Sequence, residues 1–175
     1  GASSLTSKVA IVRKSVSTLT ELDYLFLQVV IGKGKISATQ TCGNILAAVV
    51  PFAIESGLIK AGQNYTNVNV HMLNTGGSCE ITVQTPDGNV CYSGTAKVDG
   101  VPGTASPIVC NYLDTQGSTC GALFPTGNKK ELVEGINITC IDNGMPEIMI
   151  LAKDLGITGY ESPVSLNENL SLRQK

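Results

Sequence analysis

The sequence predicts an α+β protein in which a meander of β-strands surrounds one apolar helix. Short runs rich in β-branched and aromatic residues recur along the chain, and turn-forming residues separate them. One stretch, residues 41–54, combines the length of a helix with an apolar run and no charged side chain. Because such a helix is apolar on every side, other elements must enclose it. With 175 residues the chain can bury one core of this kind or form two small units.

The first strands follow from runs that are too short for a helix and rich in β-formers. They are expected, in chain order, at residues 7–12, 24–31, 68–73 and 80–85. The sequence Pro-Asp-Gly-Asn at residues 86–89 is a strong turn signal. We therefore expect residues 90–98 to return as the hairpin partner of residues 80–85.

The helix is expected to begin at Thr-Cys-Gly-Asn, residues 41–44, with Asn44 capping or holding the turn, and to end at Gly57. Cys42 then lies at the start of the helix. Backbone N–H groups of a first helical turn have no partner within the helix, so they attract anions and favour a thiolate. Pro51 falls inside this helix, where proline costs about 3 kcal/mol or kinks the axis. We expect a bend there.

The second half of the chain is less regular. Residues 100–107 contain two prolines and two glycines, which predicts an ordered loop. Turn residues and lysines at 124–130 mark the best domain boundary. Two further strands, at residues 136–141 and 147–152, and a polar tail at 167–175 complete the chain. This second unit lacks an apolar helix like the first, and is predicted to be unfinished.

Composition excludes several classes of partner. The net charge is −2, the basic residues are scattered, and the chain has three Phe, five Tyr and no Trp. Neither a phosphate-binding surface nor a base-stacking platform is visible, so no nucleic acid is expected. The longest apolar run contains Pro51 and falls well short of the roughly 20 residues that span a bilayer. No membrane association is predicted.

Six cysteines and three Asn-x-Ser/Thr sequons allow a secreted, disulfide-bonded reading. The cysteines are sparse, however, and neither a Cys-x-x-Cys pair nor a His-containing cluster suggests zinc. Reduced cysteines in a cytoplasmic protein, with no metal, are the prediction.

Two residues carry the strongest chemical signals, and each has a structural alternative. Cys42 is either a small buried hydrophobe or a functional thiol whose pKa is lowered by its place at a helix start. Lys8 is either a solvated charge at a strand end or, in a partly desolvated cleft, a group that takes and returns a proton. His71 is expected to be structural because no triad partner is evident. Asp142 and Asp154 are turn residues or substrate contacts.

Eight motifs follow one another along the chain. They are Thr-Ser-Lys-Val-Ala-Ile-Val at residues 6–12, Leu-Asp-Tyr-Leu-Phe-Leu-Gln-Val at 22–29, Cys-Gly-Asn-Ile-Leu at 42–46, Pro-Phe-Ala-Ile-Glu at 51–55, Gly-Val-Pro-Gly-Thr at 100–104, Pro-Thr-Gly-Asn at 125–128, Thr-Cys-Ile-Asp at 139–142 and Asp-Leu-Gly-Ile-Thr-Gly at 154–159. In this order they resemble the PrpF family of isomerases. The resemblance covers nearly the whole chain. It implies the diaminopimelate epimerase-like fold, in which each of two halves wraps a curved, barrel-like mixed sheet around a central helix.

On this resemblance the chain divides at residue 125. Residues 1–125 would form the first half without its Gly-rich N-terminal strand, and residues 126–175 would begin an incomplete second half. Because the family's active site lies in a cleft between halves, this chain alone is expected to be inactive.

The resemblance also implies a reaction and its residues. Lys8 and Cys42 would be the catalytic pair, with Ser7, Gly43 and Asn44 binding substrate. The reaction is a cofactor-independent shift of a double bond, by 1,3-proton transfer, in a small di- or tricarboxylate such as aconitate, methylitaconate or oxalomesaconate. A homodimer is compatible with this reading. The alternative is a non-catalytic β-rich binding or structural module whose cysteines are buried in the core or disulfide-bonded.

Overall fold

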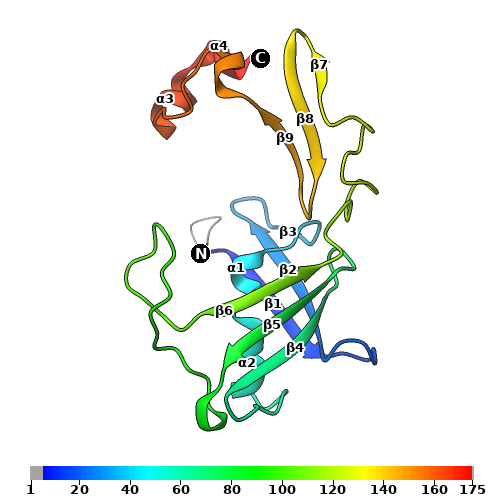
Figure 1. Ribbon diagram of the computed structural model, residues 1–175, viewed down its shortest axis with the longest axis vertical. Helices are drawn as coiled ribbons and strands as arrows, with labels where there is room; N and C mark the ends of the chain where they lie inside the picture. The colour runs from blue at the N-terminus through cyan, green and yellow to red at the C-terminus, as the bar shows by residue number, and fades with distance from the viewer. Residues whose placement is uncertain (1–5, 175) are drawn as a thin grey trace. The chain divides into compact units, whose positions relative to one another are not determined.

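The computed structural model describes residues 6–174; the first five residues of the predicted first half and the last residue of the second lie outside the described residues. The chain forms two compact units, Gly1–Asp114 and Thr115–Lys175. The predicted α+β class holds, with two sheets and a few short helices (Figure 1).

A six-stranded mixed sheet forms most of the first unit. Its strands are β1 (Lys8–Lys14), β2 (Leu22–Val30), β3 (Lys35–Ser37), β4 (Tyr65–Met72), β5 (Ser78–Gln84) and β6 (Ile108–Leu113). The order is β1-β2-β4-β5-β6, and β3 pairs with β2. The β2–β4 pair is parallel and every other pair is antiparallel. Four of these strands, β1, β2, β4 and β5, overlap the runs in which the sequence predicts strands.

One face of this sheet carries the hydrophobic core. Alternate residues of β4 and β5 are buried, as expected for strands with one covered face. The covering elements are two short helices, α1 (Gly43–Leu46) and α2 (Val49–Glu55). Helix α2 contacts both β1 and β5, although β2 and β4 separate these two strands in the sheet. Buried side chains of both helices, including Leu46 and Val50, complete the core.

The apolar helix is interrupted, but not where the sequence predicts. The bend expected at Pro51 is wrong, because the chain breaks at Ala47 and Ala48 instead, between α1 and α2. Pro51 falls in the first turn of α2, where a backbone N–H has no intrahelical acceptor and proline costs little.

The predicted end of the helix is confirmed. Gly57 has φ +74° and follows the last turn of α2. Its N–H donates to the Ile54 carbonyl at 3.0 Å, and the Leu58 N–H donates to the Ala53 carbonyl at 2.8 Å. This is the Schellman pattern, which satisfies carbonyls that the helix leaves open.

The predicted hairpin beyond residues 86–89 is wrong. Residues 90–98 form no strand, and the partner of β5 is β6, at Ile108–Leu113. Between them the chain makes one isolated bridge, Ala96 to Ala105. Glycines and prolines interrupt residues 94–107, so this segment cannot sustain a ladder until Ile108.

The second unit is a three-stranded antiparallel sheet with short helical turns. Its strands are β7 (Glu131–Val133), β8 (Ile136–Asp142) and β9 (Pro146–Ile150). The 3₁₀ turn η2 (Ala152–Leu155) and helices α3 (Pro163–Glu168) and α4 (Leu170–Arg173) follow, so the predicted polar tail is partly helical. The Ser162 hydroxyl caps α3 by accepting from the Ser165 N–H at 3.1 Å.

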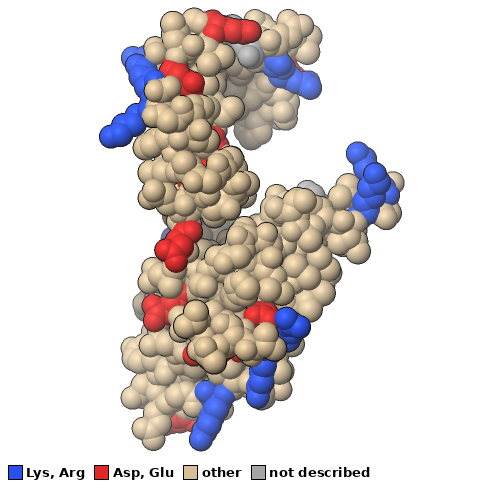
Figure 2. All heavy atoms as spheres, turned by 90° about the vertical axis from the view of Figure 1, so that its right-hand side faces the viewer, with Lys and Arg blue, Asp and Glu red and all other residues tan. Residues whose placement is uncertain are grey.

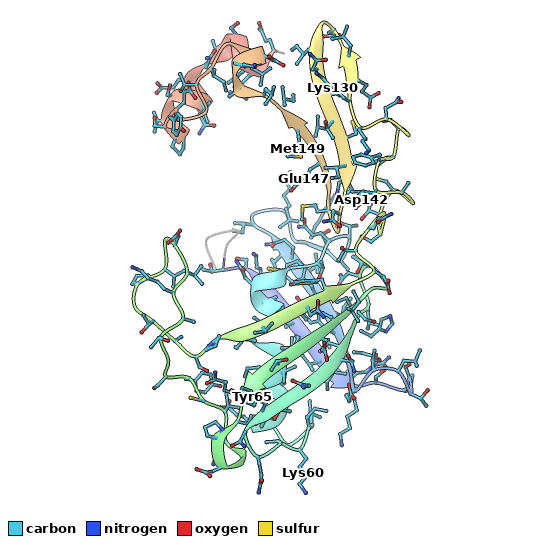
Figure 3. All side chains as sticks on the ribbon, viewed as in Figure 1. Lys60, Tyr65, Lys130, Asp142, Glu147 and Met149 are labelled. Carbon is cyan, nitrogen blue, oxygen red and sulfur yellow. The ribbon has the colours of Figure 1, made fainter. Side chains whose placement is uncertain are left out.

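The boundary expected at residue 125 lies inside the second unit. Residues 117–123 fold against the end of β8, where Asp142 is labelled in Figure 3. The Asp142 N–H donates to the Leu123 carbonyl at 2.9 Å, and the Gly117 N–H donates to the Asp142 carbonyl at 2.8 Å. These backbone bonds join the loop to the second sheet.

Charge is dispersed over the surface. Figure 2 shows, on one face, acidic and basic side chains scattered among wide uncharged areas, as the composition suggests. Within residues 6–174 no helix has the length and hydrophobicity that a transmembrane segment needs.

Candidate active site

Lys8 and Cys42, which lie 34 residues apart in the sequence, meet on the covered face of the first sheet. The Lys8 Nζ donates to the Cys42 Sγ at 3.5 Å. Both side chains are half-buried, so neither is sealed from solvent. The structure therefore brings together the two residues to which the sequence assigns the chemistry.

Cys42 is the N-cap residue of α1, with the extended backbone that an N-cap requires (φ −134°, ψ 108°). The Tyr24 hydroxyl holds this residue by donating to the Cys42 carbonyl at 3.2 Å. Burial, and then the neighbouring Cys42 and Tyr112, raise the pKa of Tyr24, which keeps this hydroxyl a donor. A strand of the core thereby fixes the start of the helix.

The helix start contributes N–H groups rather than a strong macrodipole. Helix α1 has only four residues, so few peptide dipoles align behind Cys42. Its first internal hydrogen bond runs from the Leu46 N–H to the Cys42 carbonyl, at 3.1 Å. The N–H groups of Gly43 and Asn44 precede this bond and are not used by the helix.

Lys8 is positioned by the register of β1 against β2. Lys8 lies opposite Gln28, and Ala10 and Val12 follow it on the same side of the strand, against the core. The Lys8 Nζ is 6.0 Å from the centroid of the Phe26 ring, at the outer limit of a cation–π contact. An apolar groove continues from Ala10 and Val12; its other lining residues are Ile45, Ala48, Val49 and Phe52.

The three predicted substrate-binding residues differ in exposure. Gly43 and Asn44 are exposed at the start of α1. The sequence predicts that Asn44 either caps the helix or holds the turn, and the capping alternative is wrong, because the cap position belongs to Cys42 and no side chain caps α1. Ser7 is buried, and its carbonyl accepts from the Val29 N–H at 2.9 Å. The Ser7 Oγ has no hydrogen-bond partner among the described residues.

One further residue lies at Gly43, and the sequence analysis missed it. Tyr112 belongs to β6 and pairs with Cys79, which faces the core. A Cβ on Gly43 would lie 2.6 Å from the Tyr112 hydroxyl oxygen, so the hydroxyl occupies the space that glycine leaves. The signal that could have found Tyr112 is its place two residues after Cys110 in one strand, on the same face.

The remaining polar candidates lie outside this site. His71 is on the other face of the sheet, where its Nδ1 is 3.5 Å from the Asp23 carboxylate, which agrees with a structural role. Asp142 and Asp154 belong to the second unit. All six cysteines are free, and within residues 6–174 no cluster of His, Cys, Asp or Glu could hold a metal ion.

Comparisons with known proteins show what this chain is similar to. The family model described as PrpF protein matches residues 1–174. The chain is 51% identical over 175 residues to the (4E)-oxalomesaconate Delta-isomerase of Novosphingobium sp. strain KA1, covering all of this chain and 49% of that protein. It is 49% identical to the 4-oxalomesaconate tautomerase of Pseudomonas putida KT2440, covering all of this chain and 48% of that protein.

A solved structure supports the same relationship. The crystal structure of a methylitaconate-delta-isomerase superposes with a TM-score of 0.83 at 39% sequence identity, covering 98% of this chain and 46% of that one. The chain thus spans about half the length of the curated relatives it matches. With a family match over almost every residue and relatives near half identity, this chain belongs to the PrpF family.

Proposed function

We propose that the complete protein is an isomerase that moves a double bond along a small di- or tricarboxylate, without a cofactor. The contact between the Lys8 amine and the Cys42 sulfur is the observation that carries this proposal. Relatives named as oxalomesaconate, methylitaconate and methylaconitate isomerases support the reaction class. We further propose that the complete fold has the curved, barrel-like sheet around a central helix that the resemblance implies.

The proposed chemistry is a 1,3-proton transfer. A C–H bond next to the conjugated carboxylate breaks, its proton passes to one member of the Lys8–Cys42 pair, and its electrons delocalise into a dienolate. The other member of the pair then gives its own proton to the carbon at the far end of the dienolate, where the new C–H bond forms, and the double bond has moved. Proton and charge balance without an oxidant or reductant. General acid–base catalysis by such a pair contributes about 10²–10⁴-fold in rate.

The Lys8 Nζ and the Cys42 Sγ lie 3.5 Å apart, which supports a scheme in which these two groups alone carry the proton transfer. A proton taken by one group lies within reach of the other, so the pair returns to its starting state by an internal transfer. Either member of the pair can take the proton first in this scheme. Negative charge that develops on a dienolate oxygen would be stabilised by the free N–H groups of Gly43 and Asn44.

The alternative of a disulfide-bonded module has less support. All six thiols are free in this structure, and Cys42 contacts an amine rather than only hydrocarbon. A titration that found fewer than six free thiols in the native protein would favour that module.

Hydrogen exchange at carbon tests the isomerase proposal. The complete protein is incubated in D₂O with cis-aconitate, methylitaconate or oxalomesaconate, and NMR follows deuterium incorporation and isomer formation. We expect exchange with at least one acid, and a loss of about 10²–10⁴-fold in Cys42→Ala and in Lys8→Ala. Matched controls are Cys120→Ala and Lys60→Ala, both exposed residues, which should keep full exchange.

Two results would contradict the proposal separately. Absence of exchange with all three acids would remove the reaction class. Undiminished exchange in either Cys42→Ala or Lys8→Ala would remove that residue from the pair.

A further inference from the structure

Tyr112 brings a hydroxyl group to the residue that follows Cys42. The Gly43 backbone approaches the Tyr112 side chain so closely that a Cβ there would lie 2.6 Å from the hydroxyl oxygen and 3.7 Å from the ring carbon that bears it. The hydroxyl, not the ring, is therefore the part of Tyr112 in tight contact with the turn that carries Cys42. Tyr112 is 38% exposed, so it also reaches solvent.

The two tyrosines near Cys42 differ in how their hydroxyls are used. Tyr24 is fully buried and donates its hydroxyl proton to the Cys42 carbonyl. Among residues 6–174, no group accepts or donates a hydrogen bond at the Tyr112 hydroxyl. The Tyr112 hydroxyl lies against the residue that follows Cys42 and is bonded to none of the described residues, so it is available to donate to a ligand.

The Tyr112 hydroxyl also keeps its proton. Burial raises the pKa of Tyr112 to about 12, with contributions from the neighbouring thiols of Cys110, Cys79 and Cys42. At neutral pH the group is a neutral phenol. It therefore offers a hydrogen to an acceptor and adds no negative charge that would repel an anion.

We propose that the Tyr112 hydroxyl donates a hydrogen bond to a carboxylate of the substrate bound beside Cys42. This inference rests on the proposed function, because it takes the ligand to be a small di- or tricarboxylate. Lys8 supplies a positive charge beside the sulfur, and Tyr112 supplies a neutral donor at the residue after it. A ligand with two or more carboxylates can use both, whereas a monocarboxylate can use only one.

Binding of a saturated tricarboxylate, tricarballylate, tests this role without requiring turnover. Its dissociation constant is measured by calorimetry on the complete wild-type protein and on Tyr112→Phe, which keeps the ring and removes only the hydroxyl. We expect about tenfold weaker binding in the variant, the effect of one hydrogen bond to a charged group. Tyr65→Phe makes the same chemical change at an exposed position at the start of β4 (Figure 3), and should bind like the wild type.

A second variant moves the hydroxyl instead of removing it. Gly43→Ala places a methyl group against the Tyr112 hydroxyl and should weaken tricarballylate binding in the wild-type background. In the Tyr112→Phe background that methyl meets only the ring edge, at an ordinary contact distance. We expect the double variant to bind within about twofold of Tyr112→Phe alone, a non-additive result that general damage to the fold would not give.

Kinetics separate binding from a merely structural role. If the contact persists from substrate to transition state, Tyr112→Phe raises KM about tenfold and leaves kcat within about twofold. Tricarballylate binding that is equal in the wild type and in Tyr112→Phe, or absent in the wild type, would overturn the inference. Wild-type exchange in D₂O is a separate readout, so failure of the isomerase proposal is distinguishable from failure of the Tyr112 role.

Discussion

The two units of this chain differ in whether they bury a cluster of apolar side chains. In the first unit, buried hydrophobic residues from β2, the helices, β4 and β5 form one cluster, with exposures of 0–4%. In the second unit, Leu132, Ile148 and Met149 are more than half exposed. The only residue of that unit that is buried in the described part of the chain is Asp142. The first unit is therefore held by a core, and the second mainly by hydrogen bonds.

The buried carboxylates show the same contrast. Asp23, in the first unit, is held by side chains: the Ser15 hydroxyl donates to it at 2.8 Å, and Arg13 forms an ion pair at 2.8 Å. Asp142, in the second unit, accepts from the backbone N–H groups of Cys120 at 2.6 Å and Thr119 at 2.8 Å. One carboxylate joins strands on a sheet face, whereas the other organises a loop.

The largest effect is expected from a core truncation in the first unit. Leu46 is fully buried between Cys42 and α2, and Leu46→Ala should destabilise the unit by about 2–5 kcal/mol. Leu132→Ala makes the same change at a side chain that is 68% exposed, and should cost about 0.5 kcal/mol or less. Hydrogen exchange of the amides of each unit, followed by mass spectrometry, gives both values. If both substitutions lowered the free energy of unfolding equally, the proposed difference between the two units would be wrong.

A smaller effect is expected from the carboxylates, and it depends on pH. The Ser15 hydroxyl, and then Arg13, lower the pKa of Asp23; the N–H groups of Cys120 and Thr119 lower the pKa of Asp142. The pKa of each carboxyl group in the folded protein is thus below its unfolded value of about 3.9. Each carboxylate therefore contributes fully to the free energy of unfolding above about pH 3.9, and this contribution is lost as the pH falls through the folded pKa. Asp23→Asn and Asp142→Asn should each weaken their own unit at pH 7 and flatten its acid dependence.

The stability contributed by the two carboxylates should also differ in its dependence on salt. The Arg13 side chain is 63% exposed, so 0.5 M NaCl should weaken its pair with Asp23. The backbone donors of Asp142 carry no net charge, and acid unfolding of the second unit should respond less to salt. Acid titrations at low and high salt, monitored by exchange in each unit, measure this. A stronger salt response in the second unit would contradict the assignment.

The smallest effect is expected at two glycines in matched conformations. Gly57 ends α2 with φ +74°, and Gly156 ends η2 with φ +75°, and an added Cβ would meet no atom within 4 Å at either. Substitution by alanine should therefore cost only the left-handed backbone strain, about 1 kcal/mol in each case. Urea denaturation monitored in each unit tests this. A cost at Gly57 far above that at Gly156 would show that α2 transmits end strain into the core.

Local patterns in the sequence predicted most of the strands, because alternation and β-branched runs are properties of a few consecutive residues. Gly57 was found for the same reason. The break at Ala47 and Ala48 could not be found in this way, since alanine favours helix and only packing decides where a buried helix is interrupted. The pairing of β5 with β6 was also missed, because residues 90–107 form an irregular segment between these two strands.

The site was predictable to different degrees. Local sequence singled out Cys42, and the family resemblance paired it with Lys8; the structure places the two in contact, and their catalytic roles stay predictions. The spacing of Tyr112 from Cys110 predicts only that the two share a strand face, not that Tyr112 reaches Gly43. Its place depends on the long-range register of β6 on β5 and on the absence of a side chain at Gly43, two facts that lie about seventy residues apart in the sequence.

Lys8 is the first residue of β1, and among the described strands β1 pairs only with β2. Side chains alternate along β1, so a slip of one residue would present Val9 to the thiol and turn the amine outward. Molecules with this shifted register would keep their strand content and most of their core. Their far-ultraviolet circular dichroism spectrum would therefore resemble that of the native protein. Refolded preparations should therefore be checked by a measurement that reports the contact between Lys8 and Cys42, because far-ultraviolet spectroscopy alone would not detect the shifted register.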